Sequence, residues 1–294
     1  MGNFGLNTKY KASKEKPVLM FYGDFEGKGR KRILEAKYED GVCLPRRGLS
    51  CSSHAMPMVK EKTPTFHEFA TSDLIEIYSD EKIDESSRFE ANSLYSIVLI
   101  NNSESGSAKF DLEKLPNIAQ ASPIFGCSLN DVDGDGNLDL FIAQNFYGAQ
   151  RETGYFDGGI SMLLKGDGQG AFEPIDATES GIVITGDATS LVAADLNKDG
   201  RVDFIVGKNN DTPQVFINQS DADMVAVDLR SKSIGEKVLI DLGNGKKRLH
   251  EVTYGSGYLS QSPPLIFHSK VEGAPLSENV ESQPKQNRLP AAQK

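Results

Sequence analysis

The sequence predicts an all-β protein made of repeated four-stranded units, and three observations predict it. A nine-residue segment rich in Asp and Gly occurs at residues 131–139 and again at 195–203, with an apolar run of strand length on each side. A strand–turn–strand pattern recurs at the same phase. The chain is also rich in glycine, with 28 residues, as turns between short strands require. Self-similarity at a fixed period is the signature of a repeat architecture.

Each Asp-rich segment is predicted to be a loop between two consecutive strands. Residues 131–139 read Asp-Val-Asp-Gly-Asp-Gly-Asn-Leu-Asp, and residues 195–203 read Asp-Leu-Asn-Lys-Asp-Gly-Arg-Val-Asp. A third, weaker copy lies at residues 24–32. The apolar runs that flank the three copies are Val18–Tyr22 and Ile33–Ala36, Ile124–Leu129 and Leu140–Ala143, and Thr189–Ala194 and Phe204–Gly207.

Two further strands complete each unit. Because 64 residues separate Asp131 from Asp195, one period holds four short strands, the content of one propeller blade. The additional strands, with the turns that join them, are Ile97–Ile100, 101–106 and Phe110; Ile160–Leu164, 166–170 and Phe172; and Val215–Asn218, after which the third copy diverges.

The repeats predict a partial β-propeller. At most three blades are present, the last of them incomplete, whereas a closed propeller needs about 4–8 blades. Three explanations remain open: a fragment of a longer chain that holds the remaining blades, a ring closed by association, or a partial propeller capped by other parts of this chain. The first residues, Met1–Gly5, lack the basic start and apolar stretch of a signal peptide, which favours a fragment.

Residues 43–96 interrupt the β pattern. Around Met56–Lys60 and His67–Tyr78, apolar residues recur at the three- and four-residue spacing of an amphipathic helix. We therefore predict a mostly helical insertion between the second and third strands of the first blade.

The segment 131–139 has the residues of a calcium loop. Its carboxylates stand at positions 1, 3, 5 and 9, and glycine at position 6 permits a tight turn. Four carboxylates brought together repel one another, so a hard dication such as Ca²⁺, which takes 6–8 oxygen ligands, would stabilise them. The predicted ligands are Asp131, Asp133, Asp135 and Asp139 with the carbonyl of Asn137. The flanking strands, and Ile142 where an EF-hand has Glu, exclude an EF-hand.

The other two copies differ in their charge. The second offers Asp195, Asn197, Asp199 and Asp203 with the Arg201 carbonyl, and its lower negative charge predicts weaker Ca²⁺ binding. In the copy at 24–32, Lys28 and Arg32 occupy ligand positions. We expect a cationic side chain to pair with Asp24 and Glu26 there and to hold the loop without metal. The competing interpretation of all three copies is a solvated Asp-Gly turn.

At these residues the chain resembles the FG-GAP (VCBS) repeats of integrin-type propellers, whose calcium motif Asp-x-Asp-x-Asp-Gly-x-x-Asp it carries at 131–139. Downstream, Ile234–Lys246 and Glu251–Ser262, the latter with Gly-Ser-Gly-Tyr-Leu-Ser-Gln-Ser, resemble the ASPIC/UnbV module. In the cartilage acidic protein family such a module follows a propeller. The resemblance implies FG-GAP blades over 1–220 and an ASPIC/UnbV-like module over 221–269.

The C-terminal residues themselves indicate a small β unit and a tail. Met224–Leu229 and Glu236–Leu242 have strand patterns, Gly243-Asn-Gly245 is a hairpin signal, and Lys247–Tyr254 returns. We interpret residues 255–262 as a structural turn. Residues 270–294 are rich in Ser, Pro, Gln, Glu and Lys, which predicts a disordered tail.

Charge and hydropathy exclude several classes of function. Lys and Arg number 32 against 42 Asp and Glu, so the net charge of −10 argues against a nucleic-acid partner. The longest apolar run, Val18–Tyr22, is far shorter than the roughly 20 residues of a membrane-spanning helix. Cys43, Cys51 and Cys127 allow at most one internal disulfide, and a Cys43–Cys51 bridge stays open.

No catalytic motif stands out. His67-Glu68 lacks the second histidine of a zinc protease, because residue 71 is Thr. We therefore expect a non-enzymatic, calcium-stabilised scaffold for binding or adhesion, with an unidentified protein or carbohydrate partner. Weak sites would be empty in a low-calcium cytosol, which favours an extracellular, periplasmic or cell-surface location. The alternatives are a carbohydrate-active enzyme on a propeller platform and a truncated gene fragment without independent function.

Overall fold

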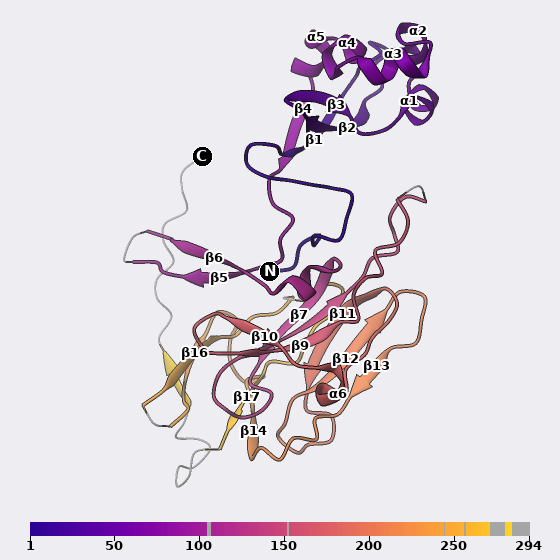
Figure 1. Cartoon of the computed structure of the whole chain (residues 1–294). Helices are drawn as coiled ribbons and strands as arrows, with labels where there is room; N and C mark the ends of the chain where they lie inside the picture. Colours follow the sequence, from indigo (N-terminus) through magenta and orange to yellow (C-terminus); the bar gives the residue numbers. More distant parts are fainter. Residues whose placement is uncertain (105–106, 152, 244, 256, 271–279, 284–294) are drawn as a thin grey trace. The chain divides into compact units, whose positions relative to one another are not determined.

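The computed structural model describes residues 1–104, 107–151, 153–243, 245–255, 257–270 and 280–283. It divides the chain into two compact units: unit 1 comprises Met1–Asn7 and Tyr95–Lys294, and unit 2 comprises Thr8–Leu94. Short antiparallel strands dominate the described residues, with six short α-helices and no closed barrel (Figure 1). This confirms the predicted all-β class. None of the helices in the described part of the chain is long and apolar enough to cross a membrane.

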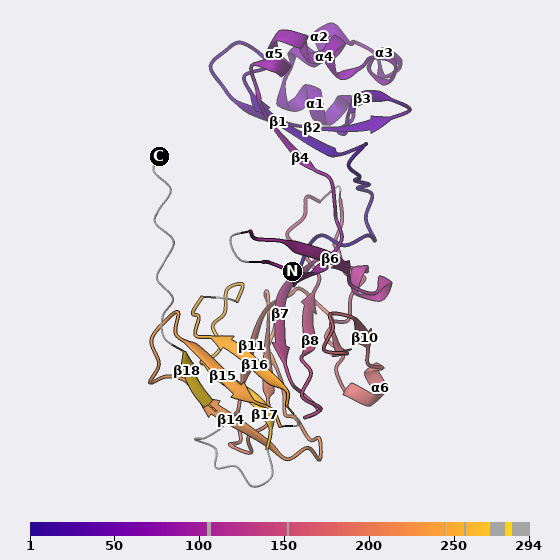
Figure 2. The same ribbon diagram turned by 90° about the vertical axis from the view of Figure 1, so that its left-hand side faces the viewer.

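Unit 2 is a four-stranded sheet with helices over one face (Figures 1 and 2). The strand order is β3-β2-β1-β4. Leu19 and Phe21 of β1 are buried in the core beneath the helices, while Met20 and Tyr22 alternate with them and are exposed. The elements are β1 (Val18–Gly23), β2 (Arg32–Glu39), β3 (Val42–Pro45), α1 (Leu49–Ala55), α2 (Met58–Lys62), α3 (Phe66–Thr71), α4 (Leu74–Tyr78), α5 (Asp80–Asp84) and β4 (Ser87–Ala91).

The helical insertion is real but shorter than predicted. Five helices lie between Leu49 and Asp84, whereas β3 and β4 occupy the two ends of the range 43–96. The prediction that Ile97–Ile100 is the third strand of the first blade is wrong, because β3 takes the place beside β2, with Cys43 opposite Tyr38, and β4 adds to the other side of β1. Strand β5 (Ile97–Asn101) pairs instead with β6 (Phe110–Lys114) in a separate two-stranded sheet of unit 1.

The second predicted blade forms as expected. Its sheet is an antiparallel meander of order β10-β9-β8-β7, and all six residues of β8 are buried. The third blade has three strands, β11-β12-β13, and thus lacks an outer strand, as predicted. The strands are β7 (Ile124–Asn130), β8 (Asp139–Gln144), β9 (Met162–Gly166), β10 (Phe172–Pro174), β11 (Ala188–Ala194), β12 (Asp203–Lys208) and β13 (Gln214–Phe216), accompanied by η1 (Asn117–Gln120) and α6 (Ala177–Ser180).

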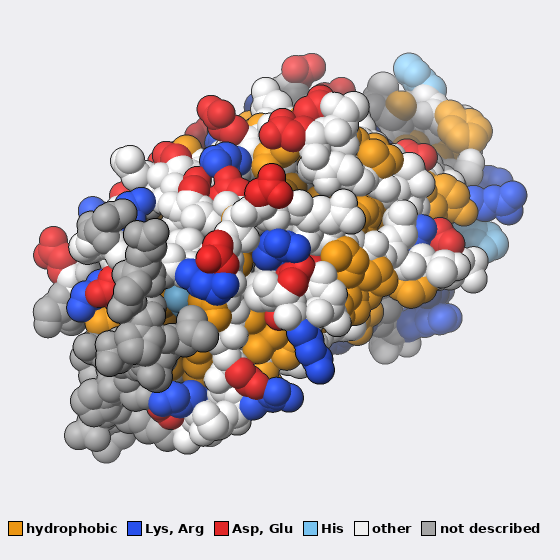
Figure 3. All heavy atoms as spheres, turned by 90° about the horizontal axis from the view of Figure 1, so that it is seen from below, with side chains coloured by type: hydrophobic (Ala, Val, Ile, Leu, Met, Phe, Trp, Pro, Cys, Tyr) orange, Lys and Arg blue, Asp and Glu red, His pale blue; other side chains and the backbone are white. Residues whose placement is uncertain are grey.

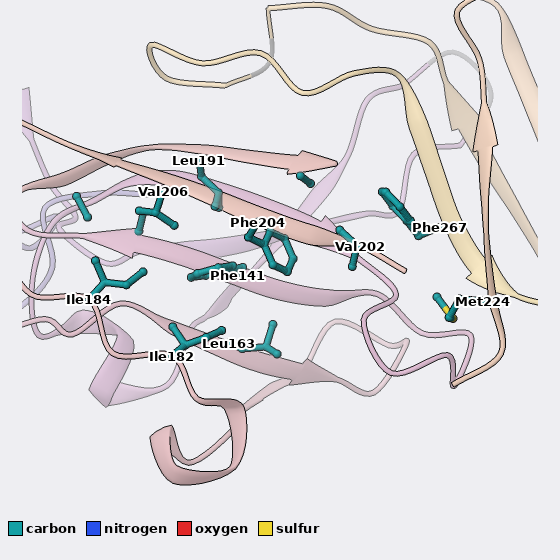
Figure 4. Close-up of a cluster of buried hydrophobic side chains, with 13 residues drawn as sticks. Phe141, Leu163, Ile182, Ile184, Leu191, Val202, Phe204, Val206, Met224 and Phe267 are labelled. Carbon is teal, nitrogen blue, oxygen red and sulfur yellow. The ribbon is translucent and has the colours of Figure 1, made fainter. Parts of the chain in front are cut away.

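The two blades share one hydrophobic core with the C-terminal strands (Figure 4). Phe141 of β8 and Phe204 of β12 meet edge to face, with ring centroids 4.7 Å apart. Met224 and Phe267, from beyond the blades, complete this core at the end opposite Ile184.

The C-terminal module, Met224–Ser269, contains the predicted strands. β15 (Lys237–Asp241) and β16 (Lys247–Glu251) form the predicted hairpin, and β14 (Met224–Asp228) pairs with β17 (Leu265–Ser269) (Figure 2). In the predicted turn at 255–262, the Ser262 hydroxyl accepts a hydrogen bond from the Ala193 amide of β11 at 3.0 Å. Most of the predicted disordered tail, residues 271–279 and 284–294, lies outside the described residues; Val280–Gln283 is strand β18, antiparallel to β15.

The three cysteines are free thiols in this structure, so the Cys43–Cys51 bridge is not formed. On the face of unit 1 shown in Figure 3, acidic and basic side chains are interspersed among apolar ones.

Candidate metal centre

The first Asp loop, residues 131–139, joins β7 to β8 around the carboxylate of Asp131. This side chain is fully buried, and its two oxygens accept hydrogen bonds from the amides of Gly134 at 2.8 Å and Gly136 at 3.1 Å. Gly134 and Gly136 have φ angles of 78° and 83°, which favour glycine because a Cβ is strained there. Asp131 therefore shapes the loop, and the two glycines allow the chain to turn around it.

Asp139 fastens the same loop to the sheet. It is 2% exposed, and its carboxylate accepts the amides of Val132 and Gly166, each at 3.0 Å. Gly166 ends β9, so this one carboxylate joins the start of the loop to the strand beyond β8.

Three of the predicted ligands converge. Asp131, Asp133 and Asp139 each offer a carboxylate oxygen, and these oxygens lie within 4.8 Å of one another. Burial, with the neighbouring charges of Asp135 and Asp139, raises the pKa of Asp131 to about 6, against the opposing Gly134 amide and Arg248 charge. Burial also raises the pKa of Asp139. Burial makes the ionised form of these carboxyl groups unfavourable, and a bound cation would stabilise that form.

Asp135 is drawn toward a basic side chain instead. The ammonium group of Lys165, on β9, forms an ion pair with Asp135 at 3.1 Å and a second one with Asp133. The pKa of Asp135 is lowered. Burial alone would raise it, but the hydrogen bond from the Asn137 amide and the ion pair with Lys165 outweigh burial. Sequence reasoning missed Lys165, although one signal existed: it is the exposed position in the otherwise buried strand β9.

A second basic side chain approaches from the C-terminal module. Arg248 of β16 donates to the carbonyl oxygen of Phe267 at 2.6 Å, and its charge lowers the pKa of Asp131. Its Nη1 is buried without a hydrogen-bond partner among the described residues. The cluster of carboxylates is thus balanced in part by Lys165 and Arg248.

The second Asp loop, residues 195–203, repeats the framework of the first. Asp195 accepts the amides of Asp199 at 3.1 Å and Gly200 at 3.0 Å. Asp203 is fully buried and accepts the amides of Leu196 at 2.8 Å and Asn218 at 2.9 Å. Asn218 follows β13, as Gly166 ends β9, so the last carboxylate plays the same part in both loops.

The carboxylates of the second loop are less gathered. Asp199 binds the guanidinium of Arg201 at 2.5 Å and the side-chain amide of Asn197 at 2.7 Å. Arg201 also donates to the Asn218 carbonyl at 3.1 Å. Arg201 was predicted to contribute its carbonyl, and the structure adds a role for its side chain. Among the described residues, the first loop alone brings three acidic groups together.

The basic loop, residues 24–32, keeps the framework without the acidic set. Asp24 accepts the amides of Lys28 at 3.2 Å and Gly29 at 2.5 Å, and the Gly29 hydrogen bond is the main cause that lowers its pKa. Lys28 forms an ion pair with Glu26 at 3.1 Å. This confirms the predicted pairing for Glu26; toward Asp24, Lys28 uses its amide.

The donor set of the first loop fits a hard dication. Its oxygens are carboxylates, the ligands that Ca²⁺ prefers, and the loop adds backbone carbonyls. A carboxylate oxygen that accepts one N–H retains a lone pair for a metal ion. Asp131, Asp133 and Asp139 would hold such an ion, and the ion would stabilise the charged form of Asp131 and Asp139, whose pKa values burial raises.

Comparison with known proteins agrees with this geometry. Residues 131–206 match the FG-GAP-like repeat. The match starts at Asp131, the first residue of the first Asp loop, and ends within β12, so it spans both Asp loops. It does not extend to the C-terminal module. No curated protein matches the chain.

Proposed function

We propose that this chain is a calcium-stabilised repeat scaffold that works by binding or adhesion outside the cytosol. The observation that carries the proposal is the convergence of Asp131, Asp133 and Asp139 to within 4.8 Å in a segment that matches a known repeat. The role of the ion is structural: it neutralises the carboxylates and fixes the conformation of the loop between two strands. The second Asp loop, with the same framework, is the second site.

The predicted extracellular, periplasmic or surface location follows from expected affinity. Sites of this kind in extracellular modules bind Ca²⁺ with dissociation constants of about 10⁻⁴–10⁻³ M. Lys165 and Arg248 lower the affinity further, because their charges oppose a dication. The resemblance of the C-terminal module to ASPIC/UnbV belongs to this proposal, with a protein or carbohydrate as partner.

One cavity of unit 1 bears on the alternative of a carbohydrate-active enzyme. Hydrolysis of a glycosidic bond commonly needs two carboxylates about 5–10 Å apart across one cleft. A cavity of about 550 Å³ lies beside the first Asp loop, and Asp167 is the one acidic residue among those described around it. The described residues around this cavity therefore offer no carboxylate pair for glycoside hydrolysis there.

Calorimetric titration of the full chain with CaCl₂ tests the proposal. We expect two sites, and a melting temperature that rises with Ca²⁺ and returns when EDTA is added, because a ligand of the folded state stabilises it. The variant Asp133→Ala with Asp199→Ala removes one carboxylate from each loop and should abolish both effects. Lys28→Ala in the basic loop is the matched control and should leave them intact. Melting that does not respond to Ca²⁺ in the native chain would contradict the proposal.

A further inference from the structure

Both Asp loops pack against the same strand of the C-terminal module. In the first loop, a Cβ on Gly134 would lie 2.9 Å from Sδ of Met224 and 3.0 Å from Cβ of Ala222. In the second loop, a Cβ on Gly200 would lie 2.6 Å from the carbonyl oxygen of Met224. At Gly200 a Cβ would clash with backbone, and at Gly134 it would force Met224 or Ala222 to shift. Glycine is favoured at both positions by this contact with the start of β14 and by φ angles of 78° and 85°.

Asn218, which lies between β13 and β14, is hydrogen-bonded to both loops. Asn218 donates its side-chain amide to the carbonyl of Val132 in the first loop at 2.9 Å. Its backbone amide donates to Asp203 at 2.9 Å, and its carbonyl accepts from Arg201 at 3.1 Å in the second loop. The chain that leads into the module is therefore tied to both candidate sites.

Met224 also belongs to the structure of the module. It is 2% exposed and lies in the core with Phe267, and their strands β14 and β17 pair antiparallel (Figure 4). A change in either loop therefore reaches a residue on which the attachment of the β14–β17 pair depends.

We propose that ion binding in the two Asp loops and docking of the C-terminal module are thermodynamically coupled through Met224. An ion-filled loop presents Gly134 or Gly200 in the conformation against which Met224 packs. Docked Met224 in turn holds the loops in the form that binds the ion. This coupling rests on the proposed calcium function, and linkage requires it to be reciprocal: Ca²⁺ tightens docking by the factor by which docking tightens Ca²⁺.

Arg248 works in the opposite sense at the first loop. Its positive charge near Asp131 opposes a dication when the module is docked. In the second loop, the basic side chain in contact with a predicted ligand is Arg201, which belongs to the loop itself. Arg201 therefore opposes a dication whether or not the module is docked.

Hydrogen–deuterium exchange of the full chain, with CaCl₂ and with EDTA, measures the coupling. Calcium should slow exchange in the two loops and, at least fivefold, in β14 and β17, while β1 and β2 of unit 2 serve as an internal reference. Protection of the loops without protection of β14 and β17 would overturn the coupling and leave the calcium function standing. Absence of both loop protection and binding heat would instead reject the calcium function.

Two glycines of the first loop form a matched pair for a second test. Gly134 and Gly136 have φ angles of 78° and 83°, so alanine strains the backbone similarly at either. Gly134 faces Met224, whereas a Cβ on Gly136 would meet nothing within 4 Å. Gly134→Ala should speed hydrogen exchange in β14 more than Gly136→Ala does. It should also raise the dissociation constant for Ca²⁺ at least threefold above that of Gly136→Ala. Equal effects of the two variants would refute the coupling.

A third variant keeps the test decisive if Gly134→Ala does not fold. Met224→Ala should weaken Ca²⁺ binding at both loops, although Met224 is no ligand. Its control is Val238→Ala, in a separate buried cluster of the module. Loss of Ca²⁺ affinity with Met224→Ala alone supports the coupling, and unchanged or equally reduced affinity in both variants overturns it.

Discussion

The basic loop of unit 2 and the first Asp loop of unit 1 share a framework and differ in chemistry. In each, the carboxylate of the first residue accepts two amides of its own loop: Asp24 from Lys28 and Gly29, and Asp131 from Gly134 and Gly136. At the ninth position the basic loop has Arg32 where the Asp loop has the buried Asp139. The turn is therefore independent of the complete acidic set.

This difference separates two roles that the motif combines. The first Asp is an internal cap, which would be needed with or without an ion, because it satisfies amides of the turn. The ninth Asp joins the loop to the strand beyond the next one and adds a third carboxylate to the cluster. An Asp-Gly turn alone predicts the cap; the cap together with the ninth acid predicts the metal site.

The largest effect expected from this comparison is on stability in the absence of calcium. It can be tested in the second Asp loop, which has the same framework, and whose ninth residue is Asp203. Asp203→Asn replaces an oxygen that accepts an amide with a group that donates, so one of the amides of Leu196 and Asn218 loses its partner. Leaving a buried donor unpaired costs about 1–3 kcal/mol. We expect the free energy of unfolding to fall by about 2 kcal/mol in EDTA. Because the chain has no Trp, urea titration followed by circular dichroism is the suitable measurement.

The matched change in the basic loop is Arg32→Asn. Arg32 is partly exposed and accepts no amide through its side chain, so this variant should change the free energy of unfolding by less than about 0.5 kcal/mol. A loss below about 0.5 kcal/mol for Asp203→Asn as well would show that the ninth Asp has no structural role apart from the ion.

A medium effect is expected from the basic residue that sequence analysis missed. Lys165 forms ion pairs with Asp133 and Asp135 and must give way when an ion enters the first loop. The Lys165 side chain is 49% exposed, so each pair is worth only about 0.2–1 kcal/mol. Lys165→Met should therefore raise the Ca²⁺ affinity of the first loop about fivefold, measured by calorimetry. Lys165→Arg keeps the charge and should bind like the native chain; equal affinity in all three proteins would exclude competition by Lys165.

The parts of the fold that could be predicted from sequence are those specified by local pattern. The Asp-rich loops, the four strands of the second blade and the β15–β16 hairpin follow from apolar runs bounded by Gly and Asp. Strand β4 was missed, since all five residues of Ser87–Ala91 are exposed and show no burial pattern. Most of β3, which lies beside β2, also fell within the predicted helical insertion, so β5 was assigned to that place in the wrong sheet.

The candidate site shows the same limit. The spacing of the predicted ligands in the first loop is a local feature of the sequence, and Asp131, Asp133 and Asp139 do converge. Lys165 and Arg248 reach the loop from β9 and β16, and their approach depends on sheet order and module docking. Predicting weaker binding in the second loop from its ligand charge alone left out these two cations, which reduce the advantage of the first loop.

The smallest effect is expected in the basic loop. Lys28 is 69% exposed and pairs with Glu26 at 3.1 Å, so solvent screens most of the attraction. Asp24 meanwhile holds the turn through backbone amides that a side-chain substitution leaves in place. Lys28→Met should thus lower the free energy of unfolding of the chain by no more than about 0.5 kcal/mol, in EDTA and in CaCl₂ alike, by urea titration. A loss above about 1.5 kcal/mol would mean that Lys28, rather than the hydrogen bonds of Asp24, stabilises this loop. The basic loop and the first Asp loop would then be stabilised by different interactions.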